Sequence, residues 1–416
     1  VVTHFICLGG ISRTWDGGGG DALASNPINW LGDTAPGPGD NIILNTTSHK
    51  GMTLDMNIFL VSWSQIGYLG TVTVATVYGT SGFTNLNITG DCTISNGMWT
   101  HNVNGATEVY RLSATIGGNL IIGPNGAIDV VGKGYATYNG PGAGWGGSHG
   151  GRGSTPSGPC YGSITAPMNL GSGGLGGAGG GSIYLVVSGM TSNGGIISAK
   201  SMGQPNDYSG SGGSIYLSSG ILVGNGIIRA DPQSGGWTGA GGRVALVVTN
   251  TGADFSAYSG PITAYGPGNG SGAGTVYLRT AAQGPNEGTL VIDHNTAGGY
   301  ATEITSNVTD TAVGNVIIRN KGYLLMFTNQ TLTVGGVWSN GSIFAAQLGS
   351  RVIFAGNAAS TSTVYGTNTF MGLVCTNAGG KTILFEAGRT NTVPAQGRLM
   401  LKGSAAANLI LRSTID

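Results

Sequence analysis

The stretch "GSGGLGGAGGGSIYL" (Gly171–Leu185) joins a glycine-rich run directly to a short apolar segment with the alternation of a β-strand. The ending "GGSIYL" recurs unchanged at Leu217, and the related endings "GGRVAL" and "AGTVYL" close at Leu246 and Leu278. The matching positions are Ile183, Ile215, Val244 and Val276, and the interval between neighbours is nearly constant. A nearly constant period of this kind indicates a repeat architecture.

A second series of short strands accompanies the first. Its members "GAIDV", "GIISA", "GIIRA" and "PITAY" contain Ile128, Ile197, Ile228 and Ile262, and the last three follow one another at a similar interval. A strand that recurs once per repeat cannot bury its apolar face alone, so each repeat must stack on the next. We therefore expect an all-β fold, specifically a right-handed parallel β-helix (β-solenoid) with a long Gly-rich excursion and almost no α-helix.

Strand alternation assigns a face to each residue of the two series. The residues expected to face inward are Ile183, Leu185, Ile215, Leu217, Val244, Leu246, Val276 and Leu278 in the first series and Ile197, Ala199, Ile228 and Ala230 in the second. The residues expected to face outward are Tyr184, Tyr216, Ala245 and Tyr277 in the first series and Asp129, Ser198, Arg229 and Thr263 in the second. Outward neighbours should lie about 4.8 Å apart.

Composition agrees with this fold and excludes several functions. Glycine is 81 of the 416 residues and charged residues are 8%, whereas roughly 7% and 25% are usual. Lys plus Arg and Asp plus Glu both total 17, with no basic stripe, so we expect no nucleic-acid partner. No apolar run approaches the roughly 18 residues of a membrane helix, so we expect no integral membrane segment.

The strand patterns divide the chain into five segments. Residues 1–45 would form an N-terminal strand and cap, and residues 46–131 the first solenoid turns. Residues 132–182 form the Gly-rich excursion, and residues 183–284 the regular repeats of about 30 residues. Residues 285–416 carry further β turns that we expect to continue the same domain. An excursion this long is usually functional or disordered.

The segment "TWDGGGGDALASNPINWLGDTAPGPGDNIILN" (residues 14–45) resembles the N-terminal motif of large secreted bacterial surface proteins. The segments "GGGSIYL", "GGSGGSIYL" and "GAGGRVAL" resemble the Gly-rich solenoid repeats of such proteins. The resemblance covers roughly residues 14–45 and 130–280. It implies a parallel β-helix at the cell surface or in an extracellular assembly, and it carries no catalytic residues over to this chain.

Secretion is also suggested by the start "VVTHFICLGG", which fits a mature chain after signal-peptide removal. The widely spaced Cys7, Cys92, Cys160 and Cys375 lack zinc spacing, which leaves disulfides or buried thiols open. Six sequons are candidate glycosylation sites: Asn45, Asn87, Asn269, Asn307, Asn329 and Asn340. We therefore expect a secreted, extracellular or cell-surface location.

Motifs for catalysis or cofactors lack their structural context. A G-x-G-x-x-G match at Gly174–Gly179 is followed by a strand, whereas a dinucleotide site needs a helix there. The "GGSHG" match around Ser148 and the P-loop-like Cys375–Thr382 fail for similar reasons. Scattered aspartates (Asp129, Asp207, Asp231, Asp254 and Asp293) give no convergent acid–base set. We expect no enzyme and no cofactor, with structural calcium left open and a polysaccharide-degrading β-helix as the least favoured interpretation.

Two functional hypotheses remain. The favoured one is a structural subunit of an extracellular filament or surface layer, a homopolymer whose strand edges pair between copies. The apolar N-terminal strand would make this contact through Val1, Val2, Phe5, Ile6 and Leu8. The alternative is a monomeric adhesin or carbohydrate-binding module that stacks surface glycans on Tyr184, Tyr216 and Tyr277. A covered cross-repeat tyrosine stack is the simpler interpretation, since an exposed aromatic stripe invites association.

Overall fold

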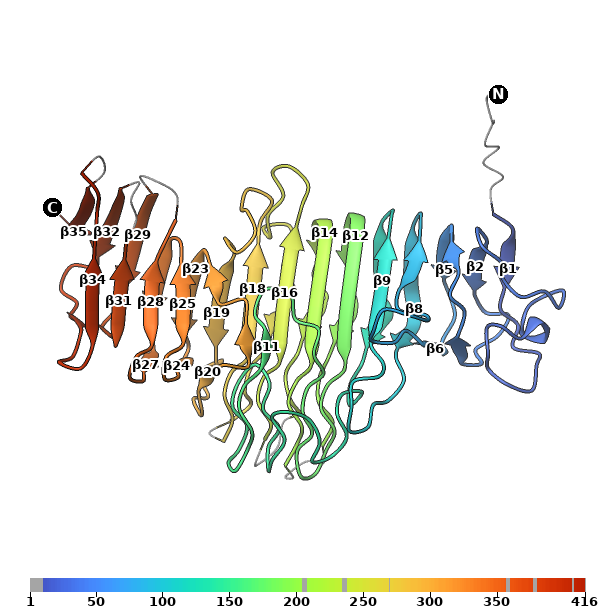
Figure 1. The fold of residues 1–416 in the computed structure, drawn as a ribbon. Helices are drawn as coiled ribbons and strands as arrows, with labels where there is room; N and C mark the ends of the chain where they lie inside the picture. The colour runs from blue at the N-terminus through green and yellow to red at the C-terminus, as the bar shows by residue number, and fades with distance from the viewer. Residues whose placement is uncertain are drawn as a thin grey trace.

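The computed structural model describes residues 10–203, 208–233, 238–268, 270–356, 360–376, 380–405 and 408–415. Strands account for 42% of the chain and helix for 1%, which confirms the all-β prediction. In these ranges the one helical element is a 3-10 turn, η1 (Pro27–Asn29). The strands stand side by side in one long row from the N-terminal to the C-terminal region, and most pairs are parallel (Figure 1).

Residues 10–279, the first part, build three parallel ladders. The first ladder contains β4 (Phe59–Leu60), β7 (Leu86–Ile88), β9 (Leu112–Ile116), β12 (Ser182–Asn193), β14 (Ser214–Gly224), β16 (Arg243–Val248) and β18 (Thr275–Arg279). The second contains β3 (Met52–Leu54), β6 (Thr71–Val74), the later halves of β8 (Cys92–Thr100) and β10 (Leu120–Asp129), then β13 (Ile196–Ser198), β15 (Ile227–Arg229) and β17 (Ile262–Thr263). The third contains β1 (Ser12–Thr14), β2 (Asn41–Leu44), β5 (Ser62–Gln65), the earlier halves of β8 and β10, and the later halves of β12 and β14.

The register of these ladders matches the sequence repeats. Ile183 pairs with Ile215, Ile215 with Val244, and Val244 with Val276. In the second ladder Ile197 pairs with Ile228. The inward aliphatic residues of the three ladders form one continuous cluster, the first core. The predicted register and inner face are confirmed for this region.

The N-terminal motif folds into a hydrogen-bonded turn structure. Trp15 and Trp30 are fully buried and meet edge to face with ring centroids 5.3 Å apart. The Nζ of Lys50 donates to the carbonyl oxygens of Gly17 (3.0 Å) and Gly19 (2.5 Å), which holds the glycine turn. The carboxylate of Asp21 accepts from the side chains of Asn26 and Asn29. The glycines and acidic residues of this motif therefore serve the structure of the turn.

The glycines before the repeated strands form a ladder of their own. The backbone N–H of Ser214 donates to the carbonyl of Gly181 (3.0 Å), and that of Arg243 donates to the carbonyl of Gly213 (2.9 Å). A Cβ added at Gly213 would collide with the same carbonyl oxygen of Gly181. The glycines thus let the backbones of successive repeats approach closely within one chain.

His101 begins this glycine ladder. Its Nε2 accepts from the backbone N–H of Ser182 (3.2 Å), in the place that a glycine carbonyl takes in later repeats. Its Nδ1 therefore carries the proton and donates to the carbonyl of Asn102 (2.7 Å). Burial lowers the pKa of His101 to about 4, so the imidazole is neutral in the folded protein.

The Gly-rich excursion is folded onto the outer face of the first ladder. Strand β11 (Gly162–Ser163) pairs in parallel with β21 (Val308–Thr309), far along the chain. Arg152 of the excursion forms an ion pair with the buried Glu303 at 3.1 Å. Arg243 of β16 is fully buried beneath the excursion, where its Nε donates to the carbonyl of Tyr161 (2.8 Å). The excursion therefore connects the two parts of the molecule.

The second part follows β18 with a change of strand direction. Strand β19 (Thr289–Asp293) pairs antiparallel with β18, and the row then continues in parallel through β23 (Asn315–Arg319), β26 (Val337–Asn340), β29 (Ser360–Tyr365), β32 (Lys381–Phe385) and β35 (Leu409–Ser413). Smaller sheets contain β22 (Ala312–Val313), β25 (Thr331–Val334), β28 (Arg351–Phe354), β31 (Gly372–Cys375) and β34 (Arg398–Leu401); β20 (Thr302–Ile304), β24 (Tyr323–Met326) and β27 (Ile343–Ala346); and β30 (Asn368–Thr369) with β33 (Asn391–Thr392). The sequence repeats did not predict this reversal.

Both parts of the molecule share one sheet, and at this reversal the hydrophobic core passes from one face of that sheet to the opposite face. Tyr277 pairs with Leu290, and both belong to the core of the second part, the second core. Val276 pairs with Val291, and both belong to the first core. The outer face of the first ladder therefore becomes the inner face of the second part.

Among the described residues, we find no helix with the length and apolarity required to span a bilayer.

We predict that Gly213→Ala destabilises the fold by about 1–3 kcal/mol, because the new Cβ meets a backbone carbonyl fixed by strand pairing. Gly105→Ala is the matched control, since a Cβ there meets open space, and it should change stability by less than about 0.5 kcal/mol. Urea unfolding followed by circular dichroism measures both. Equal unfolding midpoints for the two variants would contradict a packing role for the glycine ladder.

We predict that His101 makes the fold acid-sensitive. Its pKa is 6.5 in the unfolded chain and about 4 in the fold, so the unfolded state binds the extra proton between these values. Its contribution to stability is complete above pH 6.5 and falls by about 1.4 kcal/mol per pH unit as the pH drops toward 4.

The test compares wild type with His101→Gln by urea unfolding at pH 7.5, 6 and 4.5. The stability advantage of wild type should shrink as the pH falls. His49→Gln, a substitution at an exposed histidine outside this ladder, is the matched control and should keep the acid-sensitive profile that His101→Gln loses. Parallel pH profiles for wild type and His101→Gln would refute the assignment.

Candidate functional site

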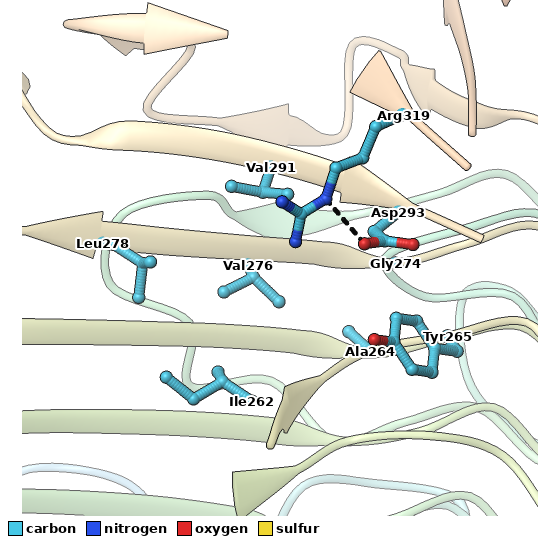
Figure 2. Close-up of a pocket in the computed structure, with 9 residues that line it drawn as sticks. All are labelled: Ile262, Ala264, Tyr265, Gly274, Val276, Leu278, Val291, Asp293 and Arg319. Carbon is cyan, nitrogen blue, oxygen red and sulfur yellow. Dashed lines mark hydrogen bonds and ion pairs between the residues drawn. The ribbon is translucent and has the colours of Figure 1, made fainter. Parts of the chain in front are cut away.

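A groove lies at the end of the first core, beside β17, β18 and β19, and we call it the junction groove. It consists of two adjoining cavities of about 270 and 410 Å³ that share Tyr265. The first cavity is lined by Ile262, Ala264, Tyr265, Gly274, Val276, Leu278, Val291, Asp293 and Arg319 (Figure 2). The second is lined by Lys200, Asp231, Pro232, Tyr265, Gly266, Pro267, His294, Asn295 and Ala297.

The apolar floor of the first cavity follows from the reversal of strand direction. Val276 and Leu278 occupy inward positions of β18, and Val291 of β19 faces the same side because it pairs with Val276. No described strand pairs with β17 beyond β15. Leu278 is therefore only half-buried, whereas Val276 and Val291 are each 8% exposed.

A charged pair borders this floor. The Nε of Arg319 donates to the carboxylate of Asp293 at 2.7 Å, from the neighbouring strand β23 (Figure 2). Asp293 also accepts from the backbone N–H of Asn295 (2.8 Å) and from the side chain of Asn320 (3.1 Å). The Asp293 side chain is 7% exposed and that of Arg319 is 57% exposed. The carboxylate is therefore enclosed, whereas the guanidinium faces solvent.

Two further charged residues, Asp231 and Lys200, line the second cavity. Asp231 accepts from the hydroxyl of Thr263 and from the backbone N–H of Tyr265, both at 2.7 Å. Burial raises the pKa of Asp231, although these donors oppose the shift. The Nζ of Lys200 donates to Gln233 at 3.3 Å, and burial lowers the pKa of Lys200.

Tyr265 lines both cavities, between the Arg319–Asp293 ion pair of the first and the charged residues of the second. Its side chain is half-buried, and desolvation is the main reason that the pKa of its phenol is raised. The negative charges of the nearby Asp293 and Asp231 carboxylates raise this pKa further. The hydroxyl is thus protonated at neutral pH and can donate a hydrogen bond. Aromatic and aliphatic surface beside a few polar groups is typical of small-ligand sites.

The cross-repeat stack expected for Tyr184, Tyr216 and Tyr277 forms only in part. Tyr184 and Tyr216 stack with ring centroids 4.7 Å apart and 14° between planes. Arg111 lies over Tyr78 at 5.0 Å and over Tyr184 at 5.9 Å, so these rings take part in internal contacts. The assignment of Tyr277 to a surface stack is wrong, because Tyr277 is 1% exposed and belongs to the second core. The change of core side explains this burial.

The structure bears on the predicted disulfides and on some of the predicted glycosylation sites. Cys92, Cys160 and Cys375 are buried, and no disulfide joins the cysteines in the described ranges, which favours the buried-thiol alternative there. Asn87, Asn307 and Asn329 are exposed, and Asn45 is half-buried.

Asn340 is a poor glycosylation candidate, because its side-chain amide is buried and donates to Asn368 (3.1 Å). Other predicted residues lie outside the described residues, namely Val1, Val2, Phe5, Ile6, Cys7, Leu8 and Asn269.

Ser148, the residue of the "GGSHG" motif, is fully buried, and its Oγ accepts from the backbone N–H of Gly153 (2.9 Å). Within the portion of the chain that is described, no group of three or more His, Cys, Asp or Glu side chains could hold a metal ion.

Sequence reasoning missed the junction groove, although one signal was available. The segment "TLVID" begins at Thr289, only a short connection after the strand pattern that closes at Leu278. A parallel connection needs a dozen or more residues, whereas an antiparallel connection can be short. This spacing could have predicted the reversal, but not that Asp231 and Asp293 would lie near the same tyrosine.

Comparison of the chain with protein-family models, with curated proteins and with solved structures found no match.

Proposed function

We propose that the protein is a secreted structural β-helix of a cell surface or extracellular layer, and that its junction groove binds carbohydrate. The groove carries the second half of this proposal, because Tyr265 and an apolar floor lie beside side chains that can hydrogen-bond hydroxyl groups. Sugar rings present C–H groups on their faces and hydroxyl groups at their edges. Such rings complement a site of this composition.

The β-helix itself is supported by the ladders of the first part. Three parallel strands per repeat enclose one core, and residues at matching positions of successive repeats pair with one another. Connections between parallel strands of one sheet are right-handed in about 98% of cases. A right-handed parallel β-helix is the arrangement that satisfies these features together.

Binding rather than turnover is favoured by the state of the carboxylates. Asp231 and Asp293 each accept hydrogen bonds on both carboxylate oxygens from backbone and side-chain donors. A general acid or base must instead reach the substrate. We accordingly propose a protein that holds its ligand without a reaction.

Glycan-array screening of the full chain tests carbohydrate binding. Tyr265→Ala should weaken binding about tenfold, because it removes the aromatic surface between the two cavities. Tyr138→Ala is the matched control, since Tyr138 is 51% exposed and lies outside the groove, and it should bind like wild type. Array binding that survives Tyr265→Ala unchanged, or no binding to any glycan, would contradict the assignment.

Self-association into a filament or layer is the second candidate. Strand β35 pairs with β32 along one edge, and the described residues supply no partner for its other edge. Leu399 of β34 and Leu411 of β35 are 58% and 48% exposed. An apolar strand edge of this kind favours pairing with a second copy of the chain.

We predict that Leu411→Lys reduces self-association, because a charge on the exposed strand opposes edge pairing. Sedimentation velocity and negative-stain microscopy measure the change, with Leu348→Lys as a control at an exposed position outside this edge. Filaments formed equally by both variants would exclude β35 as the contact. Particles that stay monomeric at all concentrations would exclude assembly.

A further inference from the structure

We infer that the junction groove selects acidic carbohydrate, namely chains that carry uronic acid carboxylates. The inference rests on the proposed function, since it names the ligand class of that groove. It is drawn from the hydrogen-bond donors of the groove that have capacity left for a ligand.

The carboxylates of the groove face the protein. Asp293 receives bonds from Arg319, Asn295 and Asn320, and it is 7% exposed. Asp231 receives bonds on both oxygens from Thr263 and from the backbone of Tyr265. Asp293 therefore has its accepting positions filled, whereas Asp231 keeps lone pairs that can accept hydrogen bonds from hydroxyl groups of a ligand.

The donors of the groove face outward. Arg319 uses its Nε for Asp293, and the described residues provide no partner for its two terminal nitrogens. In Figure 2 the guanidinium reaches from β23 over the space between Val291 and Asp293. A guanidinium with two free terminal NH2 groups matches a planar carboxylate, which it can bind through two parallel hydrogen bonds, one from each terminal nitrogen.

A second donor group stands on the other side of Tyr265. Lys200 lines the second cavity, and its one described hydrogen bond, to Gln233, is long at 3.3 Å. A chain lying across Tyr265 would thus meet a cation in each cavity and a phenol donor between them. A polymer with carboxylates along its length complements this order of groups, whereas a neutral glycan leaves both cations unused.

The test compares a glucuronic acid hexamer with its methyl ester, in which a methyl group on each carboxyl removes the charge. Calorimetry on the full chain should give at least about tenfold tighter binding for the free acid. Raising the salt concentration from 0.05 to 0.5 M should weaken binding of the acid and leave the ester nearly unchanged.

Two variants locate the interaction. Arg319→Gln keeps a donor for Asp293 but removes the charge, so it should lower the affinity for the acid about tenfold and spare the ester. Lys200→Gln should act in the same direction, and it tests the second cavity without changing the Asp293 pair. Arg351→Gln, at an exposed arginine outside the groove, is the control and should bind like wild type.

The outcomes separate this inference from the proposed function. Equal affinity for acid and ester, or tighter binding of a sulfated hexamer than of the uronate, overturns the inference and leaves carbohydrate binding in place. No binding of either probe, together with an empty glycan array, overturns both. Selective loss of acid binding in Arg319→Gln and Lys200→Gln supports the inference.

Discussion

The antiparallel pairing of β18 with β19 decides which face of the shared sheet is covered on each side of the reversal. Tyr277 and Leu290 lie on one face and Val276 and Val291 on the other. Because the first core ends on one face and the second begins on the opposite face, the two cores overlap across a single sheet. The groove, the burial of Tyr277 and the position of the excursion all depend on this constraint.

The Gly-rich excursion covers the face of β16 that points away from the first core. All six residues of β16 are buried, which requires material on both faces of that strand. Cys160 and Ile164 of the excursion belong to the second core together with Ala245. The buried Arg243 donates from Nε to the carbonyl of Tyr161 and from Nη1 to the hydroxyl of Thr275, and these two bonds offset part of the cost of burying its charge. The Gly-rich segment is thus part of the hydrophobic core.

The groove combines features with separate structural causes. Its apolar floor consists of core positions that lost their cover, and its carboxylates are held by turns at the ends of strands. Asp293 ends β19, and Asp231 follows β15. A groove formed at such an interruption needs no motif of its own. This explains why no local sequence pattern indicated it.

The sequence by itself determined the repeat, the parallel register and the inner face from Ile183 to Val276, because period and alternation are properties of neighbouring residues along the chain. It also indicated the structural role of the glycines, which recur before each strand. The side of the sheet covered after residue 278 was decided only by the tertiary structure. That choice depends on contacts such as Gly162 with Val308 and Arg152 with Glu303, which join segments that are far apart along the chain. The burial of Tyr277 follows from the β18–β19 pairing together with those contacts, and Asp231, Tyr265 and Asp293 come from separate strand ends, so no local pattern encodes their meeting.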